Sequence, residues 1–369
     1  MSGPLNGTRV LELGGIGPVP FATMMLADMG AEVLRVSRPE EDLEYASRDM
    51  LNRNKVCIRL DLKDSDSVAL VKSFSKNVEI VVEGFRPGTA ERLGLGPGDL
   101  LEEKPSLVYG RLSGWGRTGA LASTAGHDIN YISLAGALHG IGAKGGPPVP
   151  PLAYIGDFGG AGMSFATGLL AALLHARSTG EGQVVDSSIL AGAALLTLPT
   201  RNFLEHGEWK ETRGSNLLDG GAPFYGVYET ADGEFVSIGP LEPKFYAQLL
   251  RLLHLEAEEL SAQYDSAGWE KNRAIFERVF RSKTRDEWCE LLEGTDVCFA
   301  PVLSMREAEM HPHNVAEGIF VEVEGRMQPA PTPKFYGTGV AHPSEMTDIS
   351  HNPEQLRRWL SAATESEHG

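Results

Sequence analysis

Two side chains that can carry a proton stand thirty positions apart, and each lies beside glycine. His127 belongs to the run Gly126-His127-Asp128-Ile129-Asn130-Tyr131, and Asp157 belongs to Ile155-Gly156-Asp157-Phe158-Gly159-Gly160. Moving a proton from one face of a carbon to the other needs a base and an acid whose pKa values are tuned by their surroundings. Such a pair on flexible backbone predicts the chemistry of a racemase.

A structural explanation competes with this hypothesis. A His-Asp pair is more often a helix cap or a satisfied core histidine than a reaction centre, and Asp128, itself a candidate catalytic residue, could equally cap a helix that begins beside it. The glycines around Asp157 favour the functional interpretation, because backbone without a side chain can approach a ligand closely. For an enolate intermediate, we expect backbone N–H groups at the start of the helix near Asp128 to stabilise the oxygen.

Composition restricts the class of protein. The chain has 369 residues, of which 42% are hydrophobic, and this is enough for two domains with cores of their own. A net charge of -17 argues against nucleic acid and anionic membranes as partners. No apolar stretch is expected to reach the roughly 18 residues of a membrane span, and the start lacks a signal region, so we expect a cytoplasmic protein. Three separated cysteines predict neither disulfides nor a zinc site.

The pattern along the chain predicts an α/β fold. Strands are expected at 8–13, 32–36, 78–82, 107–111 and 183–186 and helices at 21–29 and 164–177, which indicates a parallel sheet with crossover helices. We expect a large domain over 1–200, a linker over 201–221, a small α+β domain over 222–314 and a return segment over 315–369. In the small domain, a hairpin or meander is predicted over 222–238, with helices at 242–253, 269–280 and 284–292.

Basic residues after the first strands could hold an anionic ligand. The loop Gly14-Gly15-Ile16-Gly17-Pro18-Val19-Pro20 departs from a dinucleotide-binding fingerprint, and the second strand ends in Ser37-Arg38 where that fingerprint has an acid. Arg38 suits a phosphate instead. So do Arg53, Lys55 and Arg59, which lie in the acid-free stretch 51–60, although each could equally be a solvated surface charge.

Several motifs give the chain a family resemblance. They comprise Val10-Leu11-Glu12-Leu13 with its glycine-proline loop, Asn52-Arg53-Asn54-Lys55, Leu60-Asp61-Leu62-Lys63, Glu83-Gly84-Phe85-Arg86-Pro87-Gly88, the His127 run and Leu218-Asp219-Gly220-Gly221-Ala222-Pro223-Phe224-Tyr225. From about Gly7 to Phe335, the chain resembles the family III CoA-transferase superfamily and, within it, the α-methylacyl-CoA racemases.

The resemblance implies an interlocked homodimer of Rossmann-like large domains and small domains, with an active site shared between subunits. It implies no metal or redox cofactor and a 2-methylacyl-CoA substrate whose CoA part lies along the large domain. Phosphate or adenine contacts are then expected from Arg38, Arg53, Arg86 and Arg92. The glutamate that pairs with the histidine in the racemases corresponds to Glu242, and their second carboxylate corresponds to Asp157.

In this hypothesis, neutral His127 removes the α-proton from one enantiomer, and protonated Asp157 delivers a proton to the opposite face. Met163, Phe224 and Tyr225 are candidates for acyl contacts. His311 and His313 are too few for a metal site. Two alternatives stay open, a CoA-transferase with Asp157 as nucleophile and a non-catalytic acyl-CoA-binding protein. The branch with a transferase's nucleophile usually lacks histidine at the position of His127, so racemisation is favoured. The tail lacks a peroxisomal ending.

Overall fold

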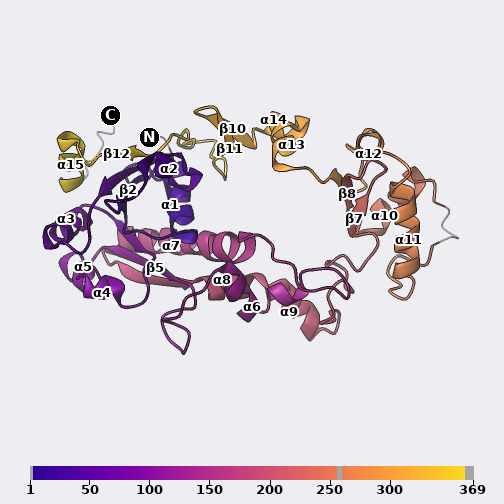
Figure 1. Cartoon of the computed structure of the whole chain (residues 1–369), viewed down its shortest axis with the longest axis horizontal. Coiled ribbons are helices and arrows are strands. Elements are labelled where there is room, and N and C mark those ends of the chain that lie inside the picture. The colour runs from indigo at the N-terminus through magenta and orange to yellow at the C-terminus, as the bar shows by residue number, and fades with distance from the viewer. Residues whose placement is uncertain (1–2, 256–259, 362–369) are drawn as a thin grey trace. The chain divides into compact units, whose positions relative to one another are not determined.

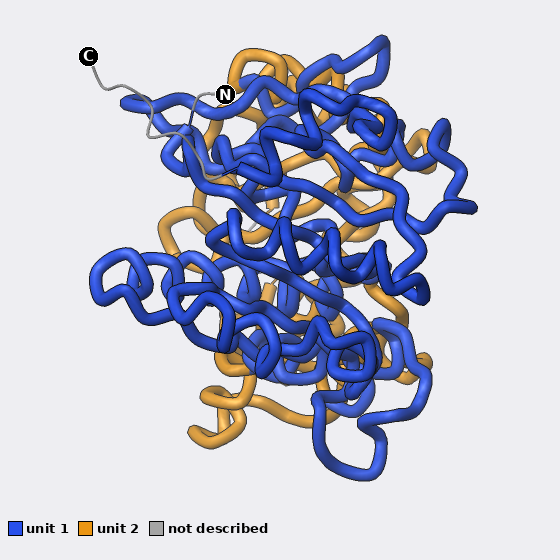
Figure 2. The backbone as a smooth tube through the Cα atoms, turned by 90° about the vertical axis from the view of Figure 1, so that its left-hand side faces the viewer, with its two compact units in different colours: residues 1–135, 152–197, 318–369 blue, residues 136–151, 198–317 orange. Residues whose placement is uncertain are grey.

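The computed structural model describes residues 3–255 and 260–361. The first two and last eight residues, on which part of the expectation about targeting rests, lie outside this range. Contacts between Cα atoms divide the chain into two compact units, coloured blue and orange in Figure 2. Unit 1 comprises residues 1–135, 152–197 and 318–369, and unit 2 comprises 136–151 and 198–317. Residues 136–151, which we expected in the large domain, therefore belong to unit 2. The boundaries expected for the four segments stay predictions.

A seven-stranded parallel sheet forms the centre of unit 1 (Figure 1). Its strands stand in the order β12-β3-β2-β1-β4-β5-β6, so the chain starts in the middle and extends toward both edges. This order follows the Rossmann-type sequence of strands and confirms the predicted α/β class. The strands are β1 (Arg9–Glu12), β2 (Glu32–Ser37), β3 (Lys55–Arg59), β4 (Ile80–Glu83), β5 (Val108–Ser113), β6 (Gln183–Ser188) and β12 (Thr347–Asp348).

Helices cover both faces of this sheet, because successive strand residues point to opposite sides. Val10 and Val82 pack in a core with α1 (Pro18–Asp28) and α7 (Met163–Thr179), whereas Leu11 packs in the core on the other face. That second core is covered by α3 (Ser65–Ser75), α5 (Pro97–Glu103) and α15 (Pro353–Leu360). The remaining elements of unit 1 are α2 (Leu43–Arg48), η1 (Met50–Asn52), α4 (Thr89–Arg92), α6 (Asp128–Leu134), the π-helical η3 (Tyr154–Gly162), α8 (Ile189–Leu196) and the hairpin β10 (Phe320–Val323) and β11 (Arg326–Pro329).

Unit 2 packs helices against a three-stranded antiparallel sheet, β7-β8-β9. Its core contains Phe224, Tyr228, Phe276, Phe280 and Trp288, which are all almost completely buried. The strands are β7 (Gly226–Glu229), β8 (Phe235–Ile238) and β9 (Phe299–Pro301). The helical elements are η2 (Leu138–Gly140), α9 (Leu198–Glu205), α10 (Pro243–Leu252), α11 (Trp269–Phe280), α12 (Arg285–Leu292), α13 (Met305–Met310) and α14 (Pro312–Glu317).

Several elements were absent from the sequence prediction. Strand β3 was interpreted as a basic patch, because Lys55 and Arg59 flank only three apolar residues. Helix α9 covers the beginning of the expected linker, and α15 lies within the expected return segment, for which no helix was predicted. The expectation about long apolar stretches was also wrong. The helical run Tyr154–Thr179 is long and apolar enough to cross a membrane, but 44% of its most apolar window is buried in the protein, so this is weak evidence for a membrane span.

Candidate active site

His127 occupies the position immediately before α6, where its backbone is extended. The side-chain oxygen of Asn130 accepts the N–H of His127 at 3.0 Å, and the His127 carbonyl accepts the N–H of Asn130 at 2.8 Å. The imidazole is exposed, and among the described residues it makes no hydrogen bond. A neutral imidazole at the surface of unit 1 can accept a proton from a bound ligand.

Asp157 lies in η3 and is only partly buried. Its backbone N–H donates to Oδ1 of Asp128 at 2.8 Å. Burial and the neighbouring charge of Asp128 raise the pKa of the Asp157 carboxyl to about 6, and the charge of His127 acts in the opposite direction. The two candidate proton carriers are therefore close enough to interact electrostatically. A carboxyl with a pKa near 6 can hold or release a proton near neutral pH.

Asp128 does not cap α6 as the structural alternative supposed. It is the first residue of that helix, is 9% exposed, and accepts a hydrogen bond from η3 instead. Its carboxylate thus fixes the backbone of Asp157 and contributes to the raised pKa of that residue. The part in catalysis expected of Asp128 stays a prediction.

The glycine loop after β1 approaches the carboxyl of Asp157 directly. A Cβ atom built on Gly17 would lie 3.2 Å from Oδ2 of Asp157, and Gly17 has a φ of +64°, which favours glycine. Next to it, Phe21 of α1 meets Phe158 edge to face at a centroid distance of 5.2 Å. The sequence placed this loop among the motifs of the family resemblance, but it did not predict the close approach of Gly17 to Asp157.

A cavity of about 1040 Å³ opens at the carboxyl ends of the parallel strands, where open α/β sheets bind ligands. Arg38, at the end of β2, and Arg86, after β4, both line it and are exposed. The cavity also includes Gly15 and Ile16, so the glycine loop borders both the cavity and Asp157. Arg38 and Arg86 are therefore placed where an anionic ligand of unit 1 could reach them.

Two of the basic residues expected to contact a phosphate are buried in the interior instead. Lys55 is 2% exposed, and its Nζ donates to Oε2 of Glu12 at 2.8 Å and to the Pro20 carbonyl at 3.0 Å. Arg53 is 6% exposed and is held by Asp28, with 2.6 Å between Nη2 and Oδ2. Because buried carboxylates already neutralise both cations, their burial disfavours contact with a phosphate, and that assignment stays a prediction.

The other two basic candidates are less enclosed. Arg59 is half-buried, with 3.3 Å between its Nε and Oδ2 of Asp348. Arg92 is exposed and donates to the hydroxyl of Thr89 at 2.9 Å. Neither lines the cavity of Arg38 and Arg86, so their contact with a phosphate stays a prediction.

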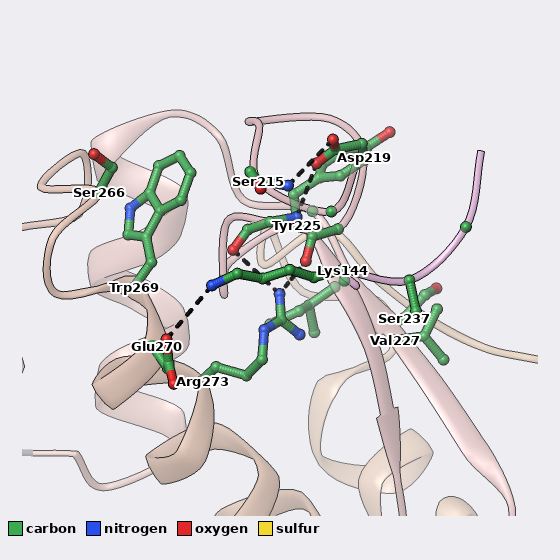
Figure 3. A pocket seen from close by; sticks show the side chains of 18 of the residues that line it. Lys144, Ser215, Asp219, Tyr225, Val227, Ser237, Ser266, Trp269, Glu270 and Arg273 are labelled. Carbon is green, nitrogen blue, oxygen red and sulfur yellow. Dashed lines mark hydrogen bonds and ion pairs between the residues drawn. The ribbon is translucent and has the colours of Figure 1, made fainter. Parts of the chain in front are cut away.

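Unit 2 contains three further candidates, Glu242, Tyr225 and Phe224. Glu242 is exposed at the residue before α10, where its charge acts on Cys298. Tyr225 is 37% exposed and lines a cavity of about 1450 Å³ together with Cys298 (Figure 3). Phe224 is completely buried in the core of unit 2, which disfavours the acyl contact expected of it, and that contact stays a prediction.

The motif from Leu218 to Tyr225 forms a braced loop at this cavity. The carboxylate of Asp219 accepts N–H groups of Asn216 at 2.8 Å and Gly221 at 3.0 Å. From the other side, the guanidinium of Arg273 donates to the carbonyls of Gly220 and Ala222 (Figure 3). These hydrogen bonds thus stabilise the backbone of the motif itself. The exposed aromatic side chain of the motif is Tyr225.

Met163 belongs to unit 1, whereas His311 and His313 belong to unit 2. Met163, the first residue of α7, is 48% exposed and is available for an apolar ligand of unit 1. Nε2 of His311 lies 3.0 Å from Oε1 of Glu293. Among the described residues, no group of three or more His, Cys, Asp or Glu side chains is arranged to hold a metal ion.

Comparisons with known proteins agree on one family. The model of CoA-transferase family III matches residues 5–353. An alpha-methylacyl-CoA racemase of Mus musculus is 44% identical over 96% of this chain and 93% of its own, and that of Homo sapiens is 42% identical over 90% and 87%. A hypothetical protein of Mycobacterium tuberculosis with a solved structure is 26% identical over 95% of this chain and 98% of its own, with a TM-score of 0.78.

Proposed function

Because the chain belongs to CoA-transferase family III, we propose that it interconverts the two enantiomers of 2-methylacyl-CoA thioesters through an enolate. The observation that carries this proposal is the pairing of His127 with a carboxyl whose pKa lies at about 6. The names of the two racemase relatives support the same activity. The thioester carbonyl acidifies the α-proton, but water alone is too weak a base to remove it.

In the proposed reaction, His127 and Asp157 act on opposite faces of the α-carbon. Neutral His127 accepts the proton of one enantiomer, and protonated Asp157 donates a proton to the other face. The roles reverse in the other direction, and each positioned carrier contributes about 100- to 10,000-fold. We propose the first amides of α6 as donors to the enolate oxygen, because that charge develops next to His127.

Binding of the CoA part is assigned to the cavity at the ends of the strands. Arg38 and Arg86 would pair with phosphate oxygens, since guanidinium groups bind phosphate in a bidentate manner. Met163 and Tyr225 are proposed for the acyl chain. It stays a prediction that CoA enters only as part of the substrate, without a further cofactor. It also stays a prediction that the protein is cytoplasmic, without nucleic-acid or membrane partners.

We further propose a homodimer in which Glu242 of one subunit orients His127 of the other. Co-expressed His127→Ala and Glu242→Ala chains would then form heterodimers with one intact site, and activity would partly return. The parental homodimers serve as controls. Verified heterodimers without activity would place both residues in the site of a single chain.

The proposed activity is tested with one pure enantiomer of a 2-methylacyl-CoA in deuterated water. We expect α-deuterium incorporation and formation of the other enantiomer, and a loss of at least about 100-fold in His127→Ala. Transfer of CoA to an added carboxylate, with an Asp157 intermediate that hydroxylamine traps, would identify a transferase instead. Binding without either reaction would identify an acyl-CoA-binding protein.

A further inference from the structure

The position of the His127 imidazole depends on its backbone. Among the described residues, the ring has no hydrogen-bond partner, so nothing within unit 1 holds it directly. The peptide bond between Gly126 and His127 is instead held at both of its polar groups by side chains of α6. Asn130 binds the N–H of His127, and Tyr131 binds the carbonyl of Gly126, one residue earlier.

Tyr131 is the stronger of these two restraints. Its hydroxyl donates to the Gly126 carbonyl at 2.6 Å, and the residue is 6% exposed. The ring of Tyr131 meets Trp115 edge to face at a centroid distance of 4.7 Å, which prevents the side chain from changing rotamer easily. Tyr131 therefore joins the loop before His127 to the core of unit 1.

The residues around Tyr131 are packed too closely for its side chain to move aside. A Cβ atom on Gly126 would lie 2.8 Å from the Trp115 ring and 2.9 Å from the Tyr131 ring. On the other side, a Cβ atom on Gly114, the residue after β5, would lie 2.2 Å from the Tyr131 hydroxyl oxygen. Two glycines thus let an aromatic pair enclose the segment that leads into His127.

Tyr131 also lies within the electrostatic field of the site. Burial and the charge of Asp157 raise the pKa of its phenol, and Arg86 acts in the opposite direction. The hydroxyl consequently stays protonated and keeps donating to Gly126 across the working pH range. The restraint on the backbone is therefore present in every protonation state of the two carriers.

We propose that Tyr131 is a positioning residue that acts through the Gly126 carbonyl to place the His127 imidazole for proton transfer. The inference rests on the proposed racemase function. A displacement of the base by about 1 Å can lower a rate about 100-fold, whereas substrate contacts elsewhere would be unaffected. The loss should concern only the proton transfer that His127 performs, because Asp157 is held separately by Asp128.

The test is single-turnover α-proton exchange in deuterated water, started separately from each enantiomer. In Tyr131→Phe, which keeps the ring and removes the hydroxyl, exchange should fall roughly tenfold for the enantiomer that His127 deprotonates, and less than twofold for the other, with KM almost unchanged. Asn130→Ala, which changes an exposed side chain, should show the same preference. Tyr109→Phe is the matched control, because its buried hydroxyl also donates to a backbone carbonyl, that of Leu95 at 2.9 Å.

The possible results distinguish the positioning role of Tyr131 from the proposed racemase function. If the wild-type protein exchanged both enantiomers and Tyr131→Phe did too at wild-type rates, the positioning role would be wrong and the proposed function would stand. Equal losses for both enantiomers would also refute the role, since they would indicate a general structural effect. If the wild-type protein exchanged neither enantiomer, the proposed function would be wrong, and with it the role of Tyr131.

Discussion

The carboxyl of Asp157 should reduce the stability of unit 1 at neutral and alkaline pH. Burial first and the charge of Asp128 second raise its pKa from 3.8 to about 6. The folded state therefore binds this proton more tightly than the unfolded chain, and the cost of ionisation appears as the pH rises from about 4 through 6. Above pH 6 the cost is constant, and below about pH 4 it vanishes.

The size of this loss of stability follows from the same shift in the pKa of Asp157. At about 1.4 kcal/mol for each pKa unit, ionising this carboxyl in the folded state costs at most about 3 kcal/mol. Asp157 is only partly buried, and screening by solvent lowers the expected cost to about 1–2 kcal/mol. Asp157→Asn should therefore be more stable than the wild-type protein by this amount at pH 8, with a difference that shrinks toward zero at pH 4.

Amide hydrogen exchange of β1 and β4 peptides in increasing urea measures the unfolding of unit 1 by itself. Glu102→Gln, which removes an exposed carboxylate at the end of α5, controls for the loss of one negative charge from a chain of net charge -17. If Asp157→Asn were no more stable than this control at pH 8, or if its advantage grew at low pH, the account of the Asp157 environment would be refuted.

Three further predictions concern the loop, the buried ion pair and the cavity of unit 1. Gly17→Ala should lower racemisation at least tenfold without changing CoA affinity, since its Cβ would press on Asp157 Oδ2 from 3.2 Å, and unchanged kcat would contradict this close approach. Lys55→Met should destabilise unit 1 by up to about 3–5 kcal/mol, because the buried carboxylate of Glu12 would lose its lysine and keep only Arg35, at 3.4 Å, and the Thr23 hydroxyl, and Glu12→Gln/Lys55→Met should recover part of this in urea unfolding. An equal loss in both variants would show that the ion pair is not the cause. Arg38→Ala should weaken CoA binding at least tenfold and reduce its salt dependence in calorimetry, whereas an unchanged Kd would remove the cavity from the CoA site.

Local sequence signals predicted the elements that depend on their own residues. The helix expected over 269–280 has those bounds in α11, and the segment expected from Thr284 is α12 with Thr284 as its cap. Threonine at the cap and Glu287 three residues later form a capping box, which is readable from neighbouring residues. Apolar runs likewise located β1, β2, β4, β5 and β6 to within a few residues.

Charged residues were harder to place, because burial of a charge depends on distant partners. The Asn52-Arg53-Asn54-Lys55 motif appeared as a basic surface patch. In the structure, Arg53 pairs with Asp28 and Lys55 with Glu12, partners that lie 25 and 43 positions away. Strand β3 places Lys55 opposite Val33 of β2, where its ammonium group reaches Glu12 at the end of β1, and no local pattern encodes which strands become neighbours.

The sequence by itself determined the residue types of the candidate site. It provided one histidine and one aspartate with glycine around them, and it predicted a parallel sheet that orders such loops at one edge. Only the tertiary structure decided their environment, because the pKa of Asp157 depends on its burial and on Asp128, which lies 29 positions away, and because the loop of Gly17 approaches its carboxyl. Electrostatic interactions and close contacts act through space. The sequence therefore gives the identity of the ionisable groups, whereas their pKa values depend on the tertiary structure.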